Sequence, residues 1–216
     1  MNKIKQPSKD FRAETVILAN GEFPKTELAL SVLRNTGFLV CCDGATNQLT
    51  DKTNLIPHAI VGDFDSVSEE NMERFANILY HVAEQNTNDL TKAVNLCRSL
   101  GKKDITFLGA TGRREDHALA NISLLARYID DQDSSFRIIT DYGMFVAIQN
   151  DTEFESFVGQ QVSLFNLSTT AVTTTNLKYP LKKYVLPELW AGTLNESLAA
   201  NFSLQVDGKM IVFLEF

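Results

Sequence analysis

Two aspartates stand two residues apart in the segment Val61-Gly62-Asp63-Phe64-Asp65-Ser66, directly after the apolar residues 59–61. On an extended chain, residues i and i+2 point to the same side, so both carboxylates would face one space. Carboxylates that share a partly dry cleft repel each other unless a cation neutralises them. Mg²⁺ takes oxygen ligands and commonly combines one or two carboxylates with substrate phosphates. The segment therefore indicates a magnesium site, and an aspartate-rich surface turn is the alternative interpretation.

The elements that would position this segment alternate along the first part of the chain. Short apolar runs rich in β-branched or aromatic residues predict strands at 15–19, 38–42, 59–61, 105–108 and 136–140. Helical spacing of apolar residues predicts helices at 26–35, 45–51, 69–77, 89–100 and 115–129. This alternation predicts an N-terminal doubly wound, mostly parallel α/β domain over residues 1–140.

Further acidic residues follow the predicted strands. Asp43 comes after the run 38–42, and Asp89 opens the predicted helix 89–100. In doubly wound sheets ligands bind outside the carboxyl ends of the strands. A single aspartate there could merely cap a helix, but Gly44 beside Asp43 would also let backbone or phosphate approach closely. We therefore expect Asp43, Asp63, Asp65 and Asp89 to hold Mg²⁺, directly or through water.

Cationic residues are expected at the same edge. The segment 109–117, Gly-Ala-Thr-Gly-Arg-Arg-Glu-Asp-His, is a glycine-bearing turn ahead of a helix, where free N–H groups favour an anion. Arg114 offers forked donors for phosphate. Lys92 lies three residues after Asp89 and could join the site or form only an intrahelical ion pair. Asp116 could complement the helix dipole, and His117 could be a core or capping residue instead of a base.

The texture of the sequence changes after residue 140. Short runs rich in Thr, Val and Phe stand at 145–148, 161–167, 171–175, 203–206 and 210–216, separated by turn-like residues. No long helical pattern occurs there. These runs predict that residues 141–216 form a C-terminal antiparallel β-sandwich, so that the chain combines an α/β and an all-β domain.

Composition narrows the function classes. The 216 residues carry a formal net charge of −7 and no basic run, which argues against a nucleic-acid partner. Three cysteines fit neither a disulfide framework nor a zinc spacing and suggest a reducing compartment. Neither a signal peptide nor a membrane-spanning run is evident, so we expect a cytoplasmic protein without a membrane partner.

Four segments in this order resemble the thiamine pyrophosphokinase family: Asp43-Gly44-Ala45, residues 62–66, Asn88 to Ala93, and residues 109–117. The resemblance implies transfer of the β,γ-pyrophosphoryl unit of ATP to the hydroxyl of thiamine, with Mg²⁺, giving AMP and thiamine diphosphate. It also implies a thiamine-binding C-terminal domain and a homodimer whose active sites lie at the subunit interface. Arg113 stands where the family usually has a second glycine, and Asn86 where it commonly has an acidic residue.

The resemblance and the site chemistry together give the candidate residues. Asp65, Asp89 and Lys92 are the catalytic candidates, with Asp65 or Asp89 accepting the hydroxyl proton. Near the C-terminus, Thr193 could replace a family serine, and Tyr179 or Trp190 could stack on thiamine or merely pack in the core. The candidates for binding ATP or thiamine are Asp43, Gly44, Ser66, Asn88, Thr91, Arg114, Asp116, His117, Tyr179, Thr193 and Asn195.

Two other function classes use the same acidic edge. A magnesium-dependent nucleotide pyrophosphohydrolase would use water as the acceptor and would cleave nucleotide without thiamine. A non-catalytic nucleotide-binding module would bind Mg-ATP and release no product.

Overall fold

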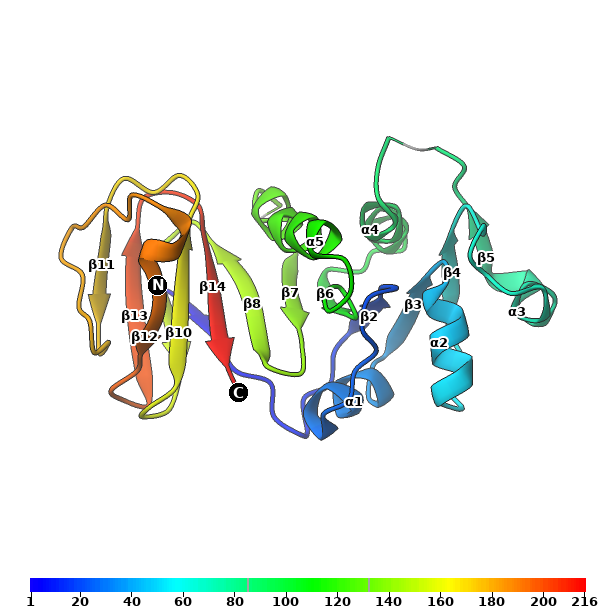
Figure 1. Ribbon diagram of the computed structural model, residues 1–216, viewed down its shortest axis with the longest axis horizontal. Coiled ribbons are helices and arrows are strands. Elements are labelled where there is room, and N and C mark those ends of the chain that lie inside the picture. Colours follow the sequence, from blue (N-terminus) through cyan, green and yellow to red (C-terminus); the bar gives the residue numbers. More distant parts are fainter. Residues whose placement is uncertain (85, 132) are drawn as a thin grey trace. The chain divides into compact units, whose positions relative to one another are not determined.

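The structure is a computed structural model that describes residues 1–84, 86–131 and 133–216 (Figure 1). The chain divides into two compact units. We call residues 9–122 and 132–141 the α/β unit, and residues 1–8, 123–131 and 142–216 the strand-rich unit.

A parallel sheet forms the centre of the α/β unit. Its strands are β2 (Thr15–Leu18), β3 (Phe38–Cys42), β4 (Ala59–Gly62), β5 (Leu79–His81), β6 (Asp104–Leu108) and β7 (Ser135–Ile139). They are ordered β7-β6-β2-β3-β4-β5, and each neighbouring pair is parallel. Because β2 pairs with β3 on one side and with β6 on the other, the strand order reverses at β2. That reversal is where an open α/β sheet presents its ligand crevice.

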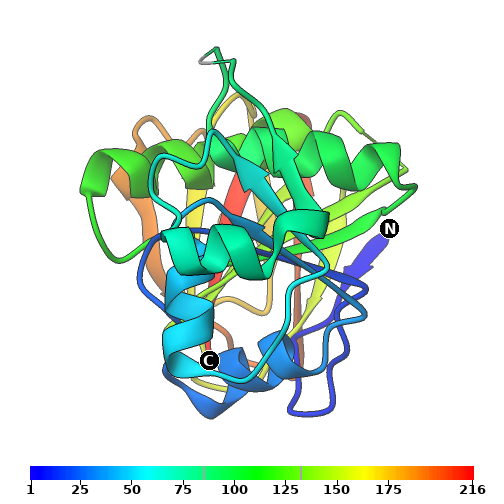
Figure 2. The same cartoon turned by 90° about the vertical axis from the view of Figure 1, so that its right-hand side faces the viewer.

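Helices lie on both faces of this sheet. They are α1 (Glu27–Arg34), α2 (Ala45–Lys52), α3 (Glu69–Arg74), α4 (Asp89–Ser99) and the first part of α5 (Glu115–Tyr128), whose residues from 123 on belong to the strand-rich unit. Figure 1 shows α1 and α2 on one face and α4 on the other, and in Figure 2 the short α3 is nearest the viewer. Thr26, Ser68 and Asn88 cap α1, α3 and α4 with their side-chain oxygens, which explains where these helices begin. The predicted doubly wound domain is confirmed.

Aliphatic residues of the central strands build the core of this unit. Val16, Ile17, Val40, Ile60 and Ile105 are completely buried. Since a parallel sheet is covered on both faces, its strands read as continuous apolar runs, as these do.

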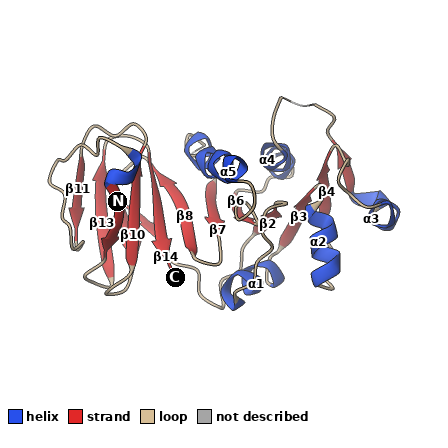
Figure 3. Cartoon of the chain, viewed as in Figure 1, coloured by secondary structure: helices blue, strands red, loops and turns tan. Residues whose placement is uncertain are grey.

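The strand-rich unit contains two sheets. One has the order β1-β9-β13-β11, and the other contains β12, β10, β14 and β8 in that order. Their bounds are β1 Asn2–Ile4, β8 Gly143–Ile148, β9 Thr152–Glu155, β10 Gln161–Asn166, β11 Val172–Thr175, β12 Gly192–Glu196, β13 Asn201–Val206 and β14 Met210–Glu215. The rings of Phe154 and Phe202 stack 4.8 Å apart and are fully buried. Figure 3 shows how strongly strands dominate here, and the predicted sandwich is confirmed.

Several elements differ from the sequence prediction. Strands β1, β5, β9 and β12 were not predicted. The predicted helix 69–77 is shorter, because α3 ends at Arg74 and a 3₁₀ turn, η1 (Ala76–Ile78), follows it. A second 3₁₀ turn, η2 (Leu189–Ala191), precedes β12. None of the helices in the described parts of the chain combines the length and apolar character that crossing a membrane requires.

Candidate active site

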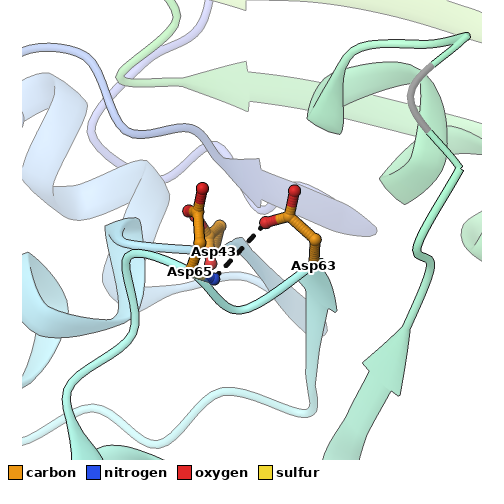
Figure 4. A group of neighbouring side chains, drawn as sticks. All are labelled: Asp43, Asp63 and Asp65. Carbon is orange, nitrogen blue, oxygen red and sulfur yellow. Dashed lines mark hydrogen bonds between the residues drawn. The ribbon is translucent and has the colours of Figure 1, made fainter.

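Three aspartates come together at the carboxyl ends of β3 and β4. Asp43 follows β3, and Asp63 and Asp65 follow β4. Each offers a carboxylate oxygen, and these oxygens all lie within 4.8 Å of one another. Figure 4 shows the three side chains around one space. We call Asp43, Asp63 and Asp65 the acidic group.

A turn, and not an extended strand, brings the carboxylates of Asp63 and Asp65 to the same space. Phe64 between them has φ 69°, and Asp43 has φ 43°, both in the left-handed region that a bulky residue such as phenylalanine seldom adopts. The Asp65 N–H donates to Asp63 Oδ1 at 3.4 Å. The extended geometry expected from the sequence is therefore wrong, although its consequence, two carboxylates on one space, holds. Gly62 is required because a Cβ there would lie 2.9 Å from Asp43 Cβ.

Asp43 lies where a negative charge is unfavourable. Its Oδ1 is buried and accepts no hydrogen bond within the described parts of the chain. Burial, together with the neighbouring charges of Asp65 and Asp89, raises the pKa of Asp43 to about 6. A buried carboxylate oxygen without a donor, beside two more carboxylates, is the environment that a hard divalent cation relieves. The acidic group therefore fits Mg²⁺.

The acidic group lines a cavity of about 690 Å³ that lies wholly in the α/β unit. The walls come from the ends of β2, β3 and β4, the start of α4, and the connection from β6 into α5. Of the predicted residues, the cavity is lined by Asp43, Asp63, Asp65, Ser66, Asn88, Asp89, Lys92, Arg114, Asp116 and His117. Asp89 shares this cavity without belonging to the acidic group.

Lys92 and Asp89 form an ion pair on the first turn of α4. Lys92 Nζ lies 3.4 Å from Asp89 Oδ1, and Lys92 is only 4% exposed. An ammonium group so removed from water makes its strongest interactions with anions. The ion pair expected as the simpler alternative is present, and it lies within the cavity.

Arg114 and Asp116 form a second pair at the start of α5. Arg114 donates to Asp116 at 3.1 Å through Nε and at 2.6 Å through Nη2, and the His117 N–H donates to Asp116 Oδ1. The hydrogen bond from Arg114 is the largest cause that lowers the pKa of Asp116 to about 2. Asp116 is therefore charged and partly neutralises Arg114.

Other predicted residues act mainly on the local structure. Asn88 Oδ1 accepts from the Thr91 N–H at 3.0 Å as the cap of α4. Thr91 is buried and does not line the cavity. A Cβ on Gly44 would lie 2.7 Å from Asn20 Nδ2, so Gly44 leaves room for the Asn20 side chain.

The cavity also contains residues that the sequence did not single out. Asn20 and Gly21 follow β2, Arg113 precedes Arg114, and Asn121 lies on α5. Asn121 Nδ2 donates to the Ala110 carbonyl at 2.8 Å. The rule that found Asp43, a polar residue directly after a predicted strand, would also have found Asn20.

The predicted thiamine-side residues lie in the strand-rich unit. Tyr179 and Trp190 are 61% and 71% exposed, so the alternative that they pack in the core is wrong. Asn195 is buried and holds the backbone of Tyr179, accepting from its N–H at 3.0 Å and donating to its carbonyl at 2.8 Å. Thr193 Oγ1 donates to the Trp190 carbonyl at 2.8 Å.

Solved structures similar to this chain show the same fold. A thiamine pyrophosphokinase from Bacillus subtilis matches with a TM-score of 0.76 at 22% identity, covering 93% of this chain and 98% of that one. A thiamin pyrophosphokinase from Candida albicans matches with a TM-score of 0.82 at 18% identity, covering 100% of this chain and 93% of that one. At these identities the likeness concerns the fold.

Sequence comparison identifies the family. A Caenorhabditis elegans protein named thiamin pyrophosphokinase 1 is 30% identical over 132 residues, which are 57% of this chain and 54% of that protein. The chain thus spans about half the length of that relative. The family model for the thiamin pyrophosphokinase substrate-binding domain matches residues 143–213. The model for the catalytic domain matches residues 29–155, more than half of the chain, so the chain belongs to the thiamin pyrophosphokinase family.

Proposed function

We propose that this chain is a thiamine diphosphokinase, which transfers pyrophosphate from ATP to the hydroxyl of thiamine and yields thiamine diphosphate and AMP. One observation carries the proposal: the acidic group, with the unpartnered Asp43 oxygen, shares a cavity with the Arg114 loop. The cavity thus offers oxygen ligands for a cation and cations for phosphate, the two requirements of phosphoryl transfer. Membership of the family supports the choice of thiamine as acceptor.

The acidic group is our proposed seat for Mg²⁺. Asp43, Asp63 and Asp65 would hold the ion, and Asp89 in the same cavity would contribute through water. Bound there, the ion would neutralise charge on the phosphate oxygens of ATP.

The side chains of the cavity supply the remaining chemistry. Asp65 or Asp89 accepts the proton of the thiamine hydroxyl as its oxygen bonds to the β-phosphorus. The bond from the β-phosphorus to the oxygen that bridges it to the α-phosphorus breaks, and AMP leaves. Lys92 and Arg114 compensate the negative charge of the triphosphate. We infer that Gly44, Ser66, Asn88, Thr91, Asp116 and His117 position nucleotide or the groups that touch it.

The thiamine site is proposed on the C-terminal part. The family model for the substrate-binding domain supports this, as do the two exposed aromatic rings of Tyr179 and Trp190. Tyr179, Thr193 and Asn195 are the proposed contacts, with residues 1–140 as the catalytic domain and 141–216 as the thiamine-binding domain. A homodimer with active sites at the subunit interface follows from the family resemblance. The free, buried state of all three cysteines supports a cytoplasmic location.

One incubation tests the function. Purified chain is supplied with Mg-ATP, with and without thiamine, and AMP and thiamine diphosphate are quantified. The proposal expects both products in equal amounts and only when thiamine is present. AMP and pyrophosphate without thiamine would identify a nucleotide pyrophosphohydrolase, and nucleotide binding without product would identify a non-catalytic module.

A further inference from the structure

The charges that line the cavity are unevenly compensated. Its cationic side chains are Lys92, Arg113 and Arg114. Lys92 is paired with the carboxylate of Asp89, and Arg114 with that of Asp116. Arg113, within the described parts of the chain, has one hydrogen-bond partner, the neutral amide oxygen of Asn20 at 3.2 Å. Among the described residues, therefore, no carboxylate forms an ion pair with the positive charge that Arg113 brings to the cavity.

A network of amides holds the Arg113 guanidinium. Asn20 Oδ1 accepts from Arg113 Nη1 and also from Gln48 Nε2 on α2, at 3.0 Å. Gln48 Nε2 in turn donates to the Gly21 carbonyl at 3.1 Å. Asn20 packs against Gly44, beside the acidic group. One nitrogen of an otherwise exposed side chain is thus tied to the end of β2, and the other donors of the fork are left for a ligand.

The backbone that carries Arg113 is fixed at its start. The Gly21 N–H donates to the Gly109 carbonyl and the Glu22 N–H to the Thr111 carbonyl, both at 2.7 Å. Gly112 has φ 88°, and a Cβ there would lie 2.5 Å from Glu22 Cβ. Arg113 itself has no left-handed backbone. The loop thus requires glycine at 112 and accepts a long side chain at 113.

We propose that Arg113 is a further substrate-binding residue of this cavity, and that it donates to a phosphate of the nucleoside polyphosphate. Asn20 is its positioning residue. Guanidinium donors match phosphate oxygens in geometry and charge, and an uncompensated arginine is the side chain that gains most when an anion arrives. This inference rests on the proposed function only in taking the cavity as the nucleotide site, and it needs no statement about the acceptor.

Calorimetric binding of nucleotides to the full chain tests the proposal without turnover. We would use α,β-methylene-ATP, in which the bond broken in the reaction is blocked, with Mg²⁺ and without thiamine, and adenosine as a second ligand. Arg113→Gln should lower the affinity for the analogue about ten-fold, because roughly one charge-assisted hydrogen bond is lost. The affinity for adenosine should stay unchanged. Arg113→Lys keeps the charge but not the forked donors, so its affinity for the analogue should lie between those of the wild type and Arg113→Gln. Arg34→Gln, at an exposed arginine on α1, is the matched control.

The outcomes separate this inference from the proposed function. Unchanged affinity of Arg113→Gln for the analogue overturns the inference, and an equal loss for adenosine overturns the assignment to phosphate. No binding by the wild-type chain overturns the nucleotide assignment and this inference with it. Wild-type binding without formation of thiamine diphosphate overturns only the proposed reaction.

A double-mutant cycle tests the positioning role of Asn20. Asn20→Ala should weaken the analogue in the wild-type background and have little further effect in the Arg113→Gln background, because residues that act through one contact are not additive. Full additivity of the two effects would show that Asn20 does not act through Arg113.

Discussion

Asp65 combines exposure to the cavity with a hydrogen bond from its neighbour. Ser66 Oγ donates to Asp65 Oδ1 at 2.8 Å, and the Asp65 side chain is exposed. We therefore propose Asp65 as the carboxylate of the acidic group that exchanges a proton with substrate. Asp43, which is buried, is better suited to holding a cation.

Asp65→Asn should leave the fold intact and lower turnover by about 10²- to 10⁴-fold, the usual range for losing a general base. Thiamine diphosphate formation from Mg-ATP and thiamine is the measurement, with thermal unfolding as the test of folding. Asp51→Asn, at an exposed aspartate near the end of α2, is the matched control. A rate near that of the wild type would remove Asp65 from the chemistry.

Asp43→Asn should affect stability in opposite directions with and without metal. Without metal, the substitution removes a buried charge that Asp65 and Asp89 repel. A gain of about 1 kcal/mol in the free energy of unfolding would raise the midpoint of thermal unfolding by roughly 2–4 °C. At a Mg²⁺ concentration one hundred times the Kd for the ion, the free energy of unfolding of the wild type should rise by about 2.7 kcal/mol. The variant should lose most of this stabilisation.

Thermal unfolding measured in chelator and in excess Mg²⁺ checks the two expectations, with Asp51→Asn again as the control. A variant that keeps the full Mg²⁺ stabilisation would show that the ion binds elsewhere.

At the residue scale, most of the cavity was predictable from the sequence because the topology of a parallel sheet determines where its strands end. Parallel strands end at one edge, so polar residues after them meet there, as Asp43 and Asp63 do. The rule could not supply the turn at Phe64, since left-handed backbone at a bulky residue depends on tertiary support. The sequence also does not reveal that the charge of Arg113 lacks an ion-pair partner among the described residues, because the folded loop determines which side chains an arginine meets.

At the scale of elements, all five helices of the described residues were predictable, whereas strands β1, β5, β9 and β12 were not. Asn88 and α4 illustrate the first case, because a cap and an apolar stripe are both local in sequence. Strand β1 illustrates the second: it has three residues and exists through parallel pairing with β9, as in Asn2 with Thr152. No local pattern records a pairing across so much of the chain.

Asp207, in the connection from β13 to β14, shows how one side chain joins elements. Its carboxylate accepts from Thr169 Oγ1 at 2.7 Å and from the Thr170 N–H at 2.8 Å, and also from Thr170 Oγ1. These hydrogen bonds, led by the Thr170 hydroxyl, lower the pKa of Asp207 below its ordinary value. A lowered pKa means that the folded state binds the proton less readily than the unfolded state.

The stability from Asp207 is therefore present at neutral pH and lost as pH falls below about 4, the ordinary aspartate value. Asp207→Asn should lower the urea midpoint at pH 7, and the gap to the wild type should narrow toward pH 3. Urea unfolding at both pH values is the measurement, and an equal gap at both would contradict the expectation.

At the scale of the whole molecule, each unit has a core of its own. The cavity is lined only by the α/β unit, whereas Phe154 and Phe202 lie in the core of the strand-rich unit. This separation predicts that stability and nucleotide affinity can be changed independently.

Phe202→Leu should destabilise the strand-rich unit by about 1 kcal/mol or more, through loss of the ring pair and of packing. Its affinity for α,β-methylene-ATP should stay within two-fold of the wild type, roughly the non-additivity expected of distant sites. Urea unfolding and calorimetry measure the two quantities, and a large loss of nucleotide affinity in the folded variant would show that the units are energetically coupled.

The hydrogen bonds between the ends of β2 and β6 have a thermodynamic consequence. Ala19, Gly21 and Glu22 donate to Leu108, Gly109 and Thr111, so strand-like pairing continues past the sheet into the wall that carries Arg113. A loop that orders only on binding loses about 1–2 kcal/mol of backbone entropy per residue. This wall is already ordered, so its backbone loses little conformational entropy when a ligand binds, and that part of the cost of binding is small.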